Sequence, residues 1–201
     1  MTPQETAQSY DQIASHWDGE KFNRKNGIAQ HERALQFSKQ KRTAIDIGCG
    51  SSGRIIELLL AAGLETEGLD ISPEMLRRAQ VRHPEQLFHQ ADICTWEFPQ
   101  KYDFISAWDS IWHAPLETHE AILTKLCGAL ETHGILIFTT GGVDQPGTRT
   151  NPFLGQPLYH AVLGIPKTLE VISQAGCICR HLEYDQHPEP HLYLIVQKAD
   201  T

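Results

Sequence analysis

The stretch that decides the fold is Ile45-Asp46-Ile47-Gly48-Cys49-Gly50-Ser51-Ser52-Gly53. It begins inside a short apolar run, residues 43–47, which is typical of a buried β-strand. Glycines then follow at the spacing GxGxxG, and residues 53–62 carry apolar side chains at helical spacing. A strand, a glycine-rich turn and a helix in this order predict the first unit of an α/β fold that binds a nucleotide.

Further strands and helices alternate downstream of this unit. Ser72-Pro73-Glu74 is a strong helix start, because Ser caps the helix, Pro fits its first position and an acid suits its first turn. This alternation predicts a parallel sheet covered on both faces, with right-handed crossovers and a ligand site at the carboxyl ends of the strands. We expect strands at 66–70, 86–90, 103–108 and 134–140, and helices at 72–83 and 118–130.

The two ends of the chain follow other patterns. Residues 1–40 are polar and predict an N-terminal helical cap in two pieces. Residues 141–155 are rich in Gly, Pro, Thr and Asn and predict a long loop, so that 141–163 is either a lid over the substrate or a segment packed on the sheet. A last helix is expected at 166–175, followed by strands at 177–184 and 191–197 that pair as a hairpin.

Composition narrows the class of protein. The chain has 201 residues, which predicts one domain, and its net charge of -8 without a basic run argues against a nucleic-acid partner. No apolar run is long enough to span a bilayer, and the first residues lack the apolar core of a signal peptide. Five cysteines without a CxxC pair are typical of reduced thiols. We therefore expect a cytoplasmic protein acting on a small molecule; the oligomeric state is open.

The acidic residues around the glycine turn distinguish between cofactors. GxGxxG alone favours a dinucleotide, but Asp46, two residues before Gly48, would repel its pyrophosphate. S-adenosylmethionine (SAM) has no phosphate and carries two cationic groups. Asp70 is placed to accept hydrogen bonds from ribose hydroxyls, and Asp92 from an adenine amino group. A short-chain NAD(P)-dependent oxidoreductase is the first alternative, although no Tyr-x-x-x-Lys pair occurs. A non-catalytic SAM-binding protein is the second.

The motifs in their order resemble the class I SAM-dependent methyltransferase superfamily, in its small bacterial type 11/25 form. Besides the glycine turn, they are Gly68-Leu69-Asp70-Ile71-Ser72, Gln90-Ala91-Asp92-Ile93 and Tyr102-Asp103-Phe104-Ile105. The resemblance implies a three-layer Rossmann-like α/β sandwich. Its mostly parallel seven-stranded sheet would have the order 3-2-1-4-5-7-6, with strand 7 antiparallel.

The resemblance also implies a set of cofactor-binding residues. The backbone from Gly48 through Cys49 to Gly50 would face the methionine moiety, and Asp70 would hold the ribose. Tyr10 belongs to an N-terminal segment whose first aromatic residue often closes over SAM in the family. Trp108 would line the pocket or belong to the core. The adenine would lie among Ile71, Met75, Ala91, Asp92 and Ile93.

The expected chemistry is in-line methyl transfer from SAM to a small-molecule acceptor, with S-adenosylhomocysteine (SAH) as product. His113, just after the fourth expected strand, is a candidate general base, with a solvated loop histidine as the alternative. The loop Asp109-Ser110-Ile111-Trp112 lacks the Pro-Pro-aromatic motif of DNA-base and protein-glutamine methyltransferases. Asp185, His187, Glu189 and His191 resemble metal ligands, but their loop-like spacing favours a solvated turn, so no metal is expected.

Overall fold

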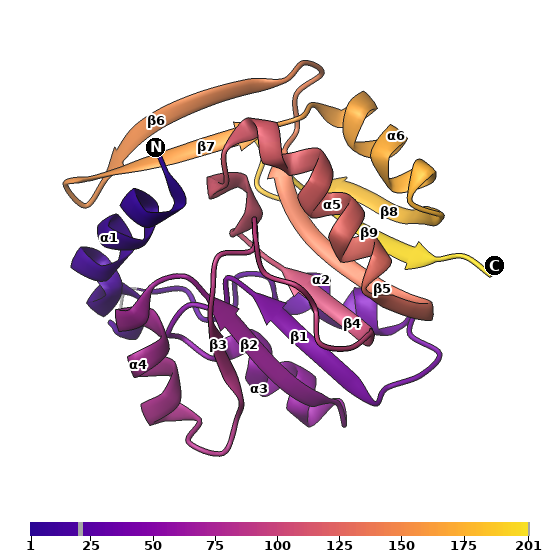
Figure 1. Ribbon diagram of the computed structural model, residues 1–201, viewed down its shortest axis with the longest axis horizontal. Helices are drawn as coiled ribbons and strands as arrows, with labels where there is room; N and C mark the ends of the chain where they lie inside the picture. Colours follow the sequence, from indigo (N-terminus) through magenta and orange to yellow (C-terminus); the bar gives the residue numbers. More distant parts are fainter. Residues whose placement is uncertain (20–21, 201) are drawn as a thin grey trace.

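A seven-stranded sheet forms the centre of the computed structural model, which describes residues 1–19 and 22–200 (Figure 1). Its order is β3-β2-β1-β4-β5-β9-β8, which becomes 3-2-1-4-5-7-6 when only these seven strands are numbered along the chain. The last strand runs antiparallel to both neighbours, so the predicted topology is confirmed. The strands are β1 (Thr43–Ile47), β2 (Glu65–Asp70), β3 (Phe88–Gln90), β4 (Tyr102–Ala107), β5 (Leu130–Gly141), β8 (Cys177–Tyr184) and β9 (His191–Lys198).

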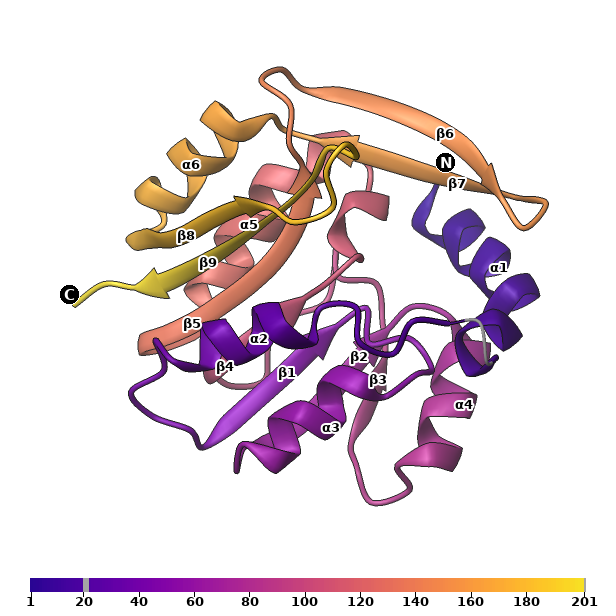
Figure 2. The ribbon, with the colours of Figure 1, turned by 180° about the vertical axis from the view of Figure 1, so that it is seen from behind.

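Helices cover both faces of this sheet. The α5 side faces the viewer in Figure 1, and the α2 and α3 side in Figure 2. Side chains alternate between the two layers along each strand, as the pleat requires. In β9, Leu194 packs with the α5 and α6 layer, whereas Tyr193 and Ile195 pack with α2 and α3. The helices are α2 (Ile28–Leu35), α3 (Arg54–Ala61), α4 (Pro73–Arg82), α5 (His119–Gly128) and α6 (Ile165–Gln174).

Local capping explains where two helices begin. In α1 (Pro3–Ile13), Thr2 and Glu5 form a capping box, in which each side chain bonds the other residue's backbone N–H. In α4, the Ser72 hydroxyl accepts a hydrogen bond from the backbone N–H of Met75, as predicted. A short 3-10 helix, η1 (Ala14–Asp18), follows α1, so the N-terminal residues are largely helical as expected.

The predicted loop at residues 141–155 is wrong. The chain forms β6 (Gly147–Phe153) and β7 (Gln156–Val162), a separate antiparallel hairpin that we call the arm. It reaches from the α6 side across to α1 (Figure 1). Its two turn residues, Leu154 and Gly155, both have positive φ, +50° and +81°, which identifies a type I′ turn. Leucine rarely adopts such a φ, so the sequence concealed the turn.

Strand β5 begins four residues earlier than the predicted 134–140. Leu130 pairs with Tyr102 before the register shifts at the next pair, and this extra pairing explains the earlier start. No helix within residues 1–19 and 22–200 is long and apolar enough to cross a membrane.

Candidate active site

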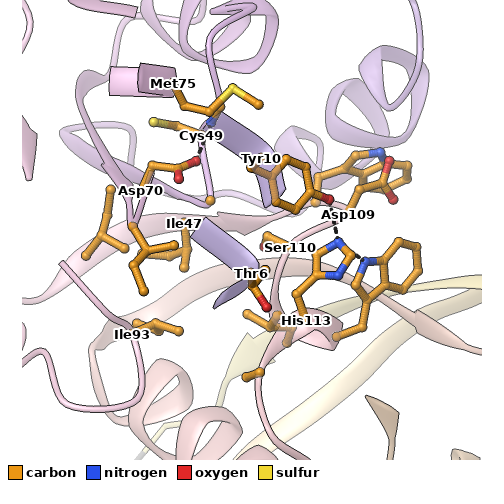
Figure 3. Close-up of a pocket in the computed structure, with 18 of the residues that line it drawn as sticks. Thr6, Tyr10, Ile47, Cys49, Asp70, Met75, Ile93, Asp109, Ser110 and His113 are labelled. Atoms are coloured by element: carbon orange, nitrogen blue, oxygen red, sulfur yellow. Dashed lines mark hydrogen bonds between the residues drawn. The ribbon is translucent and has the colours of Figure 1, made fainter. Parts of the chain in front are cut away.

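A cavity of about 430 Å³ lies at the carboxyl ends of β1, β2 and β4. That is the edge where the sequence predicted ligand binding, and the volume suits a nucleotide-sized ligand. Figure 3 shows Asp70, Cys49 and Met75 on one side of it and Tyr10 above His113 on another. Its lining includes eleven of the twelve predicted cofactor residues, namely Tyr10, Gly48, Cys49, Gly50, Asp70, Ile71, Met75, Ala91, Asp92, Ile93 and Trp108.

The glycine turn passes tightly against the loop after β4. Gly48 has φ +70°, and a Cβ built on it would lie 2.3 Å from Cβ of Ser110. The N–H groups of Gly48 and Cys49 both donate to the carbonyl of Leu69, at 2.7 and 3.0 Å. Gly48 is therefore required both for its φ and for the close approach of the two loops.

Asp70 is the carboxylate that the turn holds in place. Its Oδ2 accepts from the N–H of Gly50 at 2.8 Å and its Oδ1 from the N–H of Ser72 at 2.9 Å. Burial raises the pKa of Asp70, and the backbone hydrogen bonds oppose this rise. Each carboxylate oxygen retains a lone pair for a ligand hydroxyl.

The residues expected around an adenine lie together at the ends of β2 and β3. Met75 is buried, and Asp92 folds back to accept a hydrogen bond on Oδ1 from the N–H of Cys94 at 2.9 Å. Both line the cavity with Ile71 and Ile93. Their assignment to an adenine site stays a prediction.

Asp46 lies outside the residues that line the cavity. It is buried in β1, where its Oδ1 is 2.7 Å from Oγ of Ser106, and that hydroxyl is 3.0 Å from Nε2 of His31. Burial raises the pKa of Asp46 to about 7 and lowers that of His31 to about 4. The structure therefore places Asp46 beneath the glycine turn, within a buried polar chain, and gives it no direct contact with a ligand in the cavity.

His113 lines the cavity, but its ring nitrogens are already engaged. Nδ1 lies 2.7 Å from the carbonyl of Tyr159, which can only accept, so Nδ1 carries the proton. Nε2 then accepts from the hydroxyl of Tyr10 at 2.7 Å and from the indole N–H of Trp112 at 3.0 Å (Figure 3). Burial lowers the pKa of His113 to about 4. The base role stays a prediction, and this geometry does not favour it.

Trp108 joins the cavity to the core. Its ring is 4 % exposed and packs 5.2 Å from the ring of His31 and 5.7 Å from that of Tyr193, measured between centroids. It also lines the cavity, so both roles considered from the sequence apply.

Asp109 belongs to a buried ionic chain that sequence analysis missed. Its Oδ1 accepts from Nε2 of His191 at 2.9 Å and its Oδ2 from the side-chain amide of Asn26 at 3.0 Å, while Nδ1 of His191 donates to Asp185. Burial would raise the pKa of Asp109, but these donors hold it below its usual value. Asp109 also has φ +52°, a strained backbone that is common at functional sites.

The predicted solvated turn at residues 185–191 is therefore wrong in part. The side chains of Asp185 and His191 are buried, 5 % and 9 % exposed, and His191 bonds both Asp185 and Asp109. Their distance from Asp109 in the sequence concealed this. No cluster of metal-ligand residues was found within the described part of the chain.

Arg54 is a second cavity residue without a sequence signal. Its Nε donates to the carbonyl of Asn26 and its Nη1 to Oγ of Ser52, both at 2.9 Å, and its guanidinium lies 5.1 Å from the ring centre of Phe22. Nη2 has no hydrogen bond among these contacts. Asp109 and Arg54 therefore give one end of the cavity a negative and a positive group.

Comparison with known proteins agrees with this fold and site. Residues 44–134 match the family model described as a methyltransferase domain. Over these residues the chain is therefore similar to methyltransferase domains, in agreement with the class I SAM-dependent superfamily that its motifs resemble. Among solved structures, the CcbJ methyltransferase from Streptomyces caelestis superposes with a TM-score of 0.75 at 13 % identity, covering 98 % of this chain and 99 % of that one. These distant likenesses support the fold.

Curated relatives are longer than this chain. A trans-aconitate 2-methyltransferase from Methylobacterium radiotolerans is 38 % identical over 97 residues, which are 47 % of this chain and 36 % of that protein. The enzyme of the same name from Escherichia coli is 29 % identical over 162 residues, 71 % of this chain and 60 % of its own length. The chain thus spans between about one third and three fifths of these two relatives.

Proposed function

We propose that this protein transfers a methyl group from SAM to a small-molecule acceptor. The observation that carries the proposal is the placement of Asp70, whose carboxylate is fixed by two backbone N–H groups at the wall of a nucleotide-sized cavity. A carboxylate so placed is suited to a ribose diol. The methyltransferase-domain match over residues 44–134 supports SAM as the nucleotide.

The charges of the cavity fit SAM better than a dinucleotide. SAM carries a sulfonium, an ammonium and a carboxylate, whereas a dinucleotide presents two phosphates. Three carboxylates line the cavity, those of Asp70, Asp92 and Asp109. The positive groups of the lining are the guanidinium of Arg54 and the ring of His191, which donates from both nitrogens. Arg54 would hold the methionine carboxylate and Asp109 the ammonium, and the surplus of acid disfavours a pyrophosphate.

When bound, SAM supplies a methyl group on a sulfonium that is already a good leaving group. The protein then has to orient the acceptor and exclude water. Tyr10, Trp112 and His113 form a hydrogen-bonded wall between α1 and the loop after β4, which limits the access of water to the cavity. These residues act through packing and position.

The class of acceptor is a proposal of its own. The curated relatives are named for trans-aconitate, a small molecule, and this chain spans only part of their length. The net charge of -8 supports a small molecule over a nucleic acid. The single domain, the cytoplasmic location and the lid expected from the sequence stay predictions, as do the two alternative functions.

Calorimetry tests the proposal. Purified protein should bind SAM and SAH, and Asp70→Ala should weaken binding about 10-fold to 100-fold, since hydrogen bonds to a charged group are lost. Asp144→Ala, an exposed acid between β5 and β6, is the matched control and should leave affinity unchanged. Absence of SAM and SAH binding, or tight binding of NADH in a fluorescence titration, would refute the proposal.

A further inference from the structure

A second cavity, of about 390 Å³, adjoins the first. It lies between the arm, the end of β5 and the loop that joins β8 to β9. Trp112, His160, Gln186 and His191 line both cavities. These four side chains lie where the two cavities adjoin, so a ligand in the second cavity would lie next to a nucleotide in the first.

One face of the arm forms a wall common to the two cavities. Directly opposed residues of an antiparallel pair share a face. The pairs Arg149–His160 and Gly147–Val162 line the second cavity, while Phe153 and Leu158 of the same face line the first. The arm thus presents its side chains to both sites at once.

Two histidines meet at the boundary, with ring centres 4.7 Å apart. His113 has no lone pair left, because Nε2 accepts two hydrogen bonds and Nδ1 carries the proton. The ring of His160 lines both cavities, and its Nδ1 is buried without a hydrogen-bond partner. Nε2 makes no hydrogen bond among the described residues, so Nε2 is the nitrogen that can receive a proton from a ligand in the cavities.

The surroundings of His160 keep it neutral. Burial lowers its pKa, the positive charge of Arg149 on the neighbouring strand adds to this, and an interaction with the backbone of Leu158 opposes both without cancelling them. The other groups against the ring are Trp112 and the neutral His113. At pH 7 the ring is unprotonated, which is the state that a general base requires.

We propose that the second cavity binds the methyl acceptor and that His160 is the general base that takes the acceptor's proton. The acceptor is accordingly a small molecule whose nucleophile is a hydroxyl or an amine nitrogen that still bears a proton. A carboxylate acceptor is ionised at neutral pH and needs no base. This proposal rests on the proposed function, since SAM supplies the methyl group.

The step balances without any further reactant. The lone pair of the acceptor oxygen or nitrogen forms a bond to the methyl carbon as the carbon–sulfur bond breaks, and that electron pair stays on sulfur, giving neutral SAH. The acceptor's proton passes to His160, which then releases it to water. The methylated product and SAH leave the two cavities.

A methylation assay with labelled SAM tests this inference. Phenol and benzylamine are the probes that bear a proton, and benzoate and trans-aconitate are the carboxylate probes. We expect label in phenol or benzylamine, a fall of about 100-fold in kcat for His160→Gln and loss of the acid limb of the pH profile, as for removal of a general base. His133→Gln, at the distant end of β5 beside Asp200, is the matched control and should retain the wild-type rate.

A second variant addresses the cavity itself. A Cβ on Gly147 meets no atom within 4 Å, so Gly147→Leu fills the second cavity without a clash at that atom. It should raise the KM of the methylated probe at least 10-fold and leave the SAH affinity within twofold. An unchanged KM would contradict the acceptor site.

The outcomes separate the two proposals. Failure to bind SAM or SAH refutes the proposed function. Binding of SAH combined with label only in the carboxylate probes, or in none of the four, overturns the acceptor proposal alone. A wild-type kcat in His160→Gln overturns it as well.

Discussion

The part of the site expected to bind the methyl donor and the arm differ in how far the sequence predicts them. The donor side, residues 43–94, takes Gly48, Asp70 and Asp92 from the ends of three strands that lie close in the chain. The arm takes its wall from residues 147–162, a hairpin hydrogen-bonded to itself and separate from the main sheet. Local motifs were sufficient for the first, whereas the second depends on where the hairpin packs.

The two regions also differ in what they constrain. At Gly48 of the glycine turn, the positive φ and the close approach of Ser110 exclude any residue with a side chain. On the arm, the residues facing the first cavity are Phe153, Leu158 and His160, whose roles depend on their neighbours across the cavity. A donor site of this kind can therefore be combined with different acceptors by changing the side chains of the arm. Four substitutions test this contrast.

Gly48→Ala should have the largest effect. A positive φ costs an alanine about 1 kcal/mol or more, and the contact of 2.3 Å with Ser110 adds overpacking of about 1–3 kcal/mol. We expect a stability loss of about 3 kcal/mol in urea denaturation and no detectable SAH binding. Gly63→Ala is the control, because its φ is +90° but its Cβ would meet no atom within 4 Å. Equal losses in the two variants would contradict the close-approach argument.

His113→Leu should come next, because it leaves the Tyr10 hydroxyl and the Trp112 N–H without their acceptor. Unsatisfied buried groups cost about 1–3 kcal/mol each, so we expect a loss of about 3 kcal/mol or slightly less in the same assay. Tyr10→Phe removes one donor while Trp112 still supplies another, and should cost about 1 kcal/mol. If Tyr10→Phe costs as much as His113→Leu, the arrangement of donors around His113 is not the one described.

Asp46→Asn should alter the pH dependence of stability. The pKa of Asp46 is about 7 in the folded protein and has its ordinary value of 3.8 in the unfolded chain. Between these two pH values the folded protein holds a proton that the unfolded chain has lost. Stability from this group is therefore greatest at low pH and decreases as pH rises towards 7. Asn removes that loss, and we expect a gain of about 1–3 kcal/mol relative to wild type at pH 8 but little change at pH 4. The pKa of His31 is lowered on folding, so its contribution to the pH dependence of stability has the opposite sign. This contribution is the same in wild type and variant and cancels in the difference between them. A constant difference across this pH range would contradict burial of an ionisable Asp46.

Phe153→Ala should have the smallest effect. The Phe153 ring lies 5.5 Å from the ring centre of His16 and 6.1 Å from that of Trp17, and joins the tip of the arm to η1 over the cavity. Aromatic pairs contribute about 0.5–1.5 kcal/mol, so stopped-flow measurements should show SAH leaving a few-fold faster. Leu154→Ala, at the adjacent turn position, should leave the SAH release rate unchanged, and equal rates in both variants would count against a lid.

Much of the fold could be predicted because its signals are local. Strand and helix periodicity, the Ser72 cap and the glycine turn each act within a few residues, and they predicted the alternating strands and helices. The sheet order was predicted through the resemblance to the methyltransferase superfamily and is confirmed. The arm was missed because Leu154 occupies a turn position that normally calls for Asn, Asp or Gly. The chain of Asp109, His191 and Asp185 was missed because Asp109 follows β4, whereas Asp185 and His191 lie after β8 and at the start of β9, far away in sequence.

The sequence by itself determined the fold class, since alternating strands and helices follow from local signals, and its resemblance to the superfamily predicted the strand order. The residues expected around a nucleotide do line one cavity, and their binding roles stay a prediction. The tertiary structure decided which side chains are free to act. It places Asp46 beneath the turn, engages both nitrogens of His113 and leaves His160 at the junction of two cavities. The physical reason is that protonation and hydrogen-bond occupancy depend on neighbours brought together only by packing.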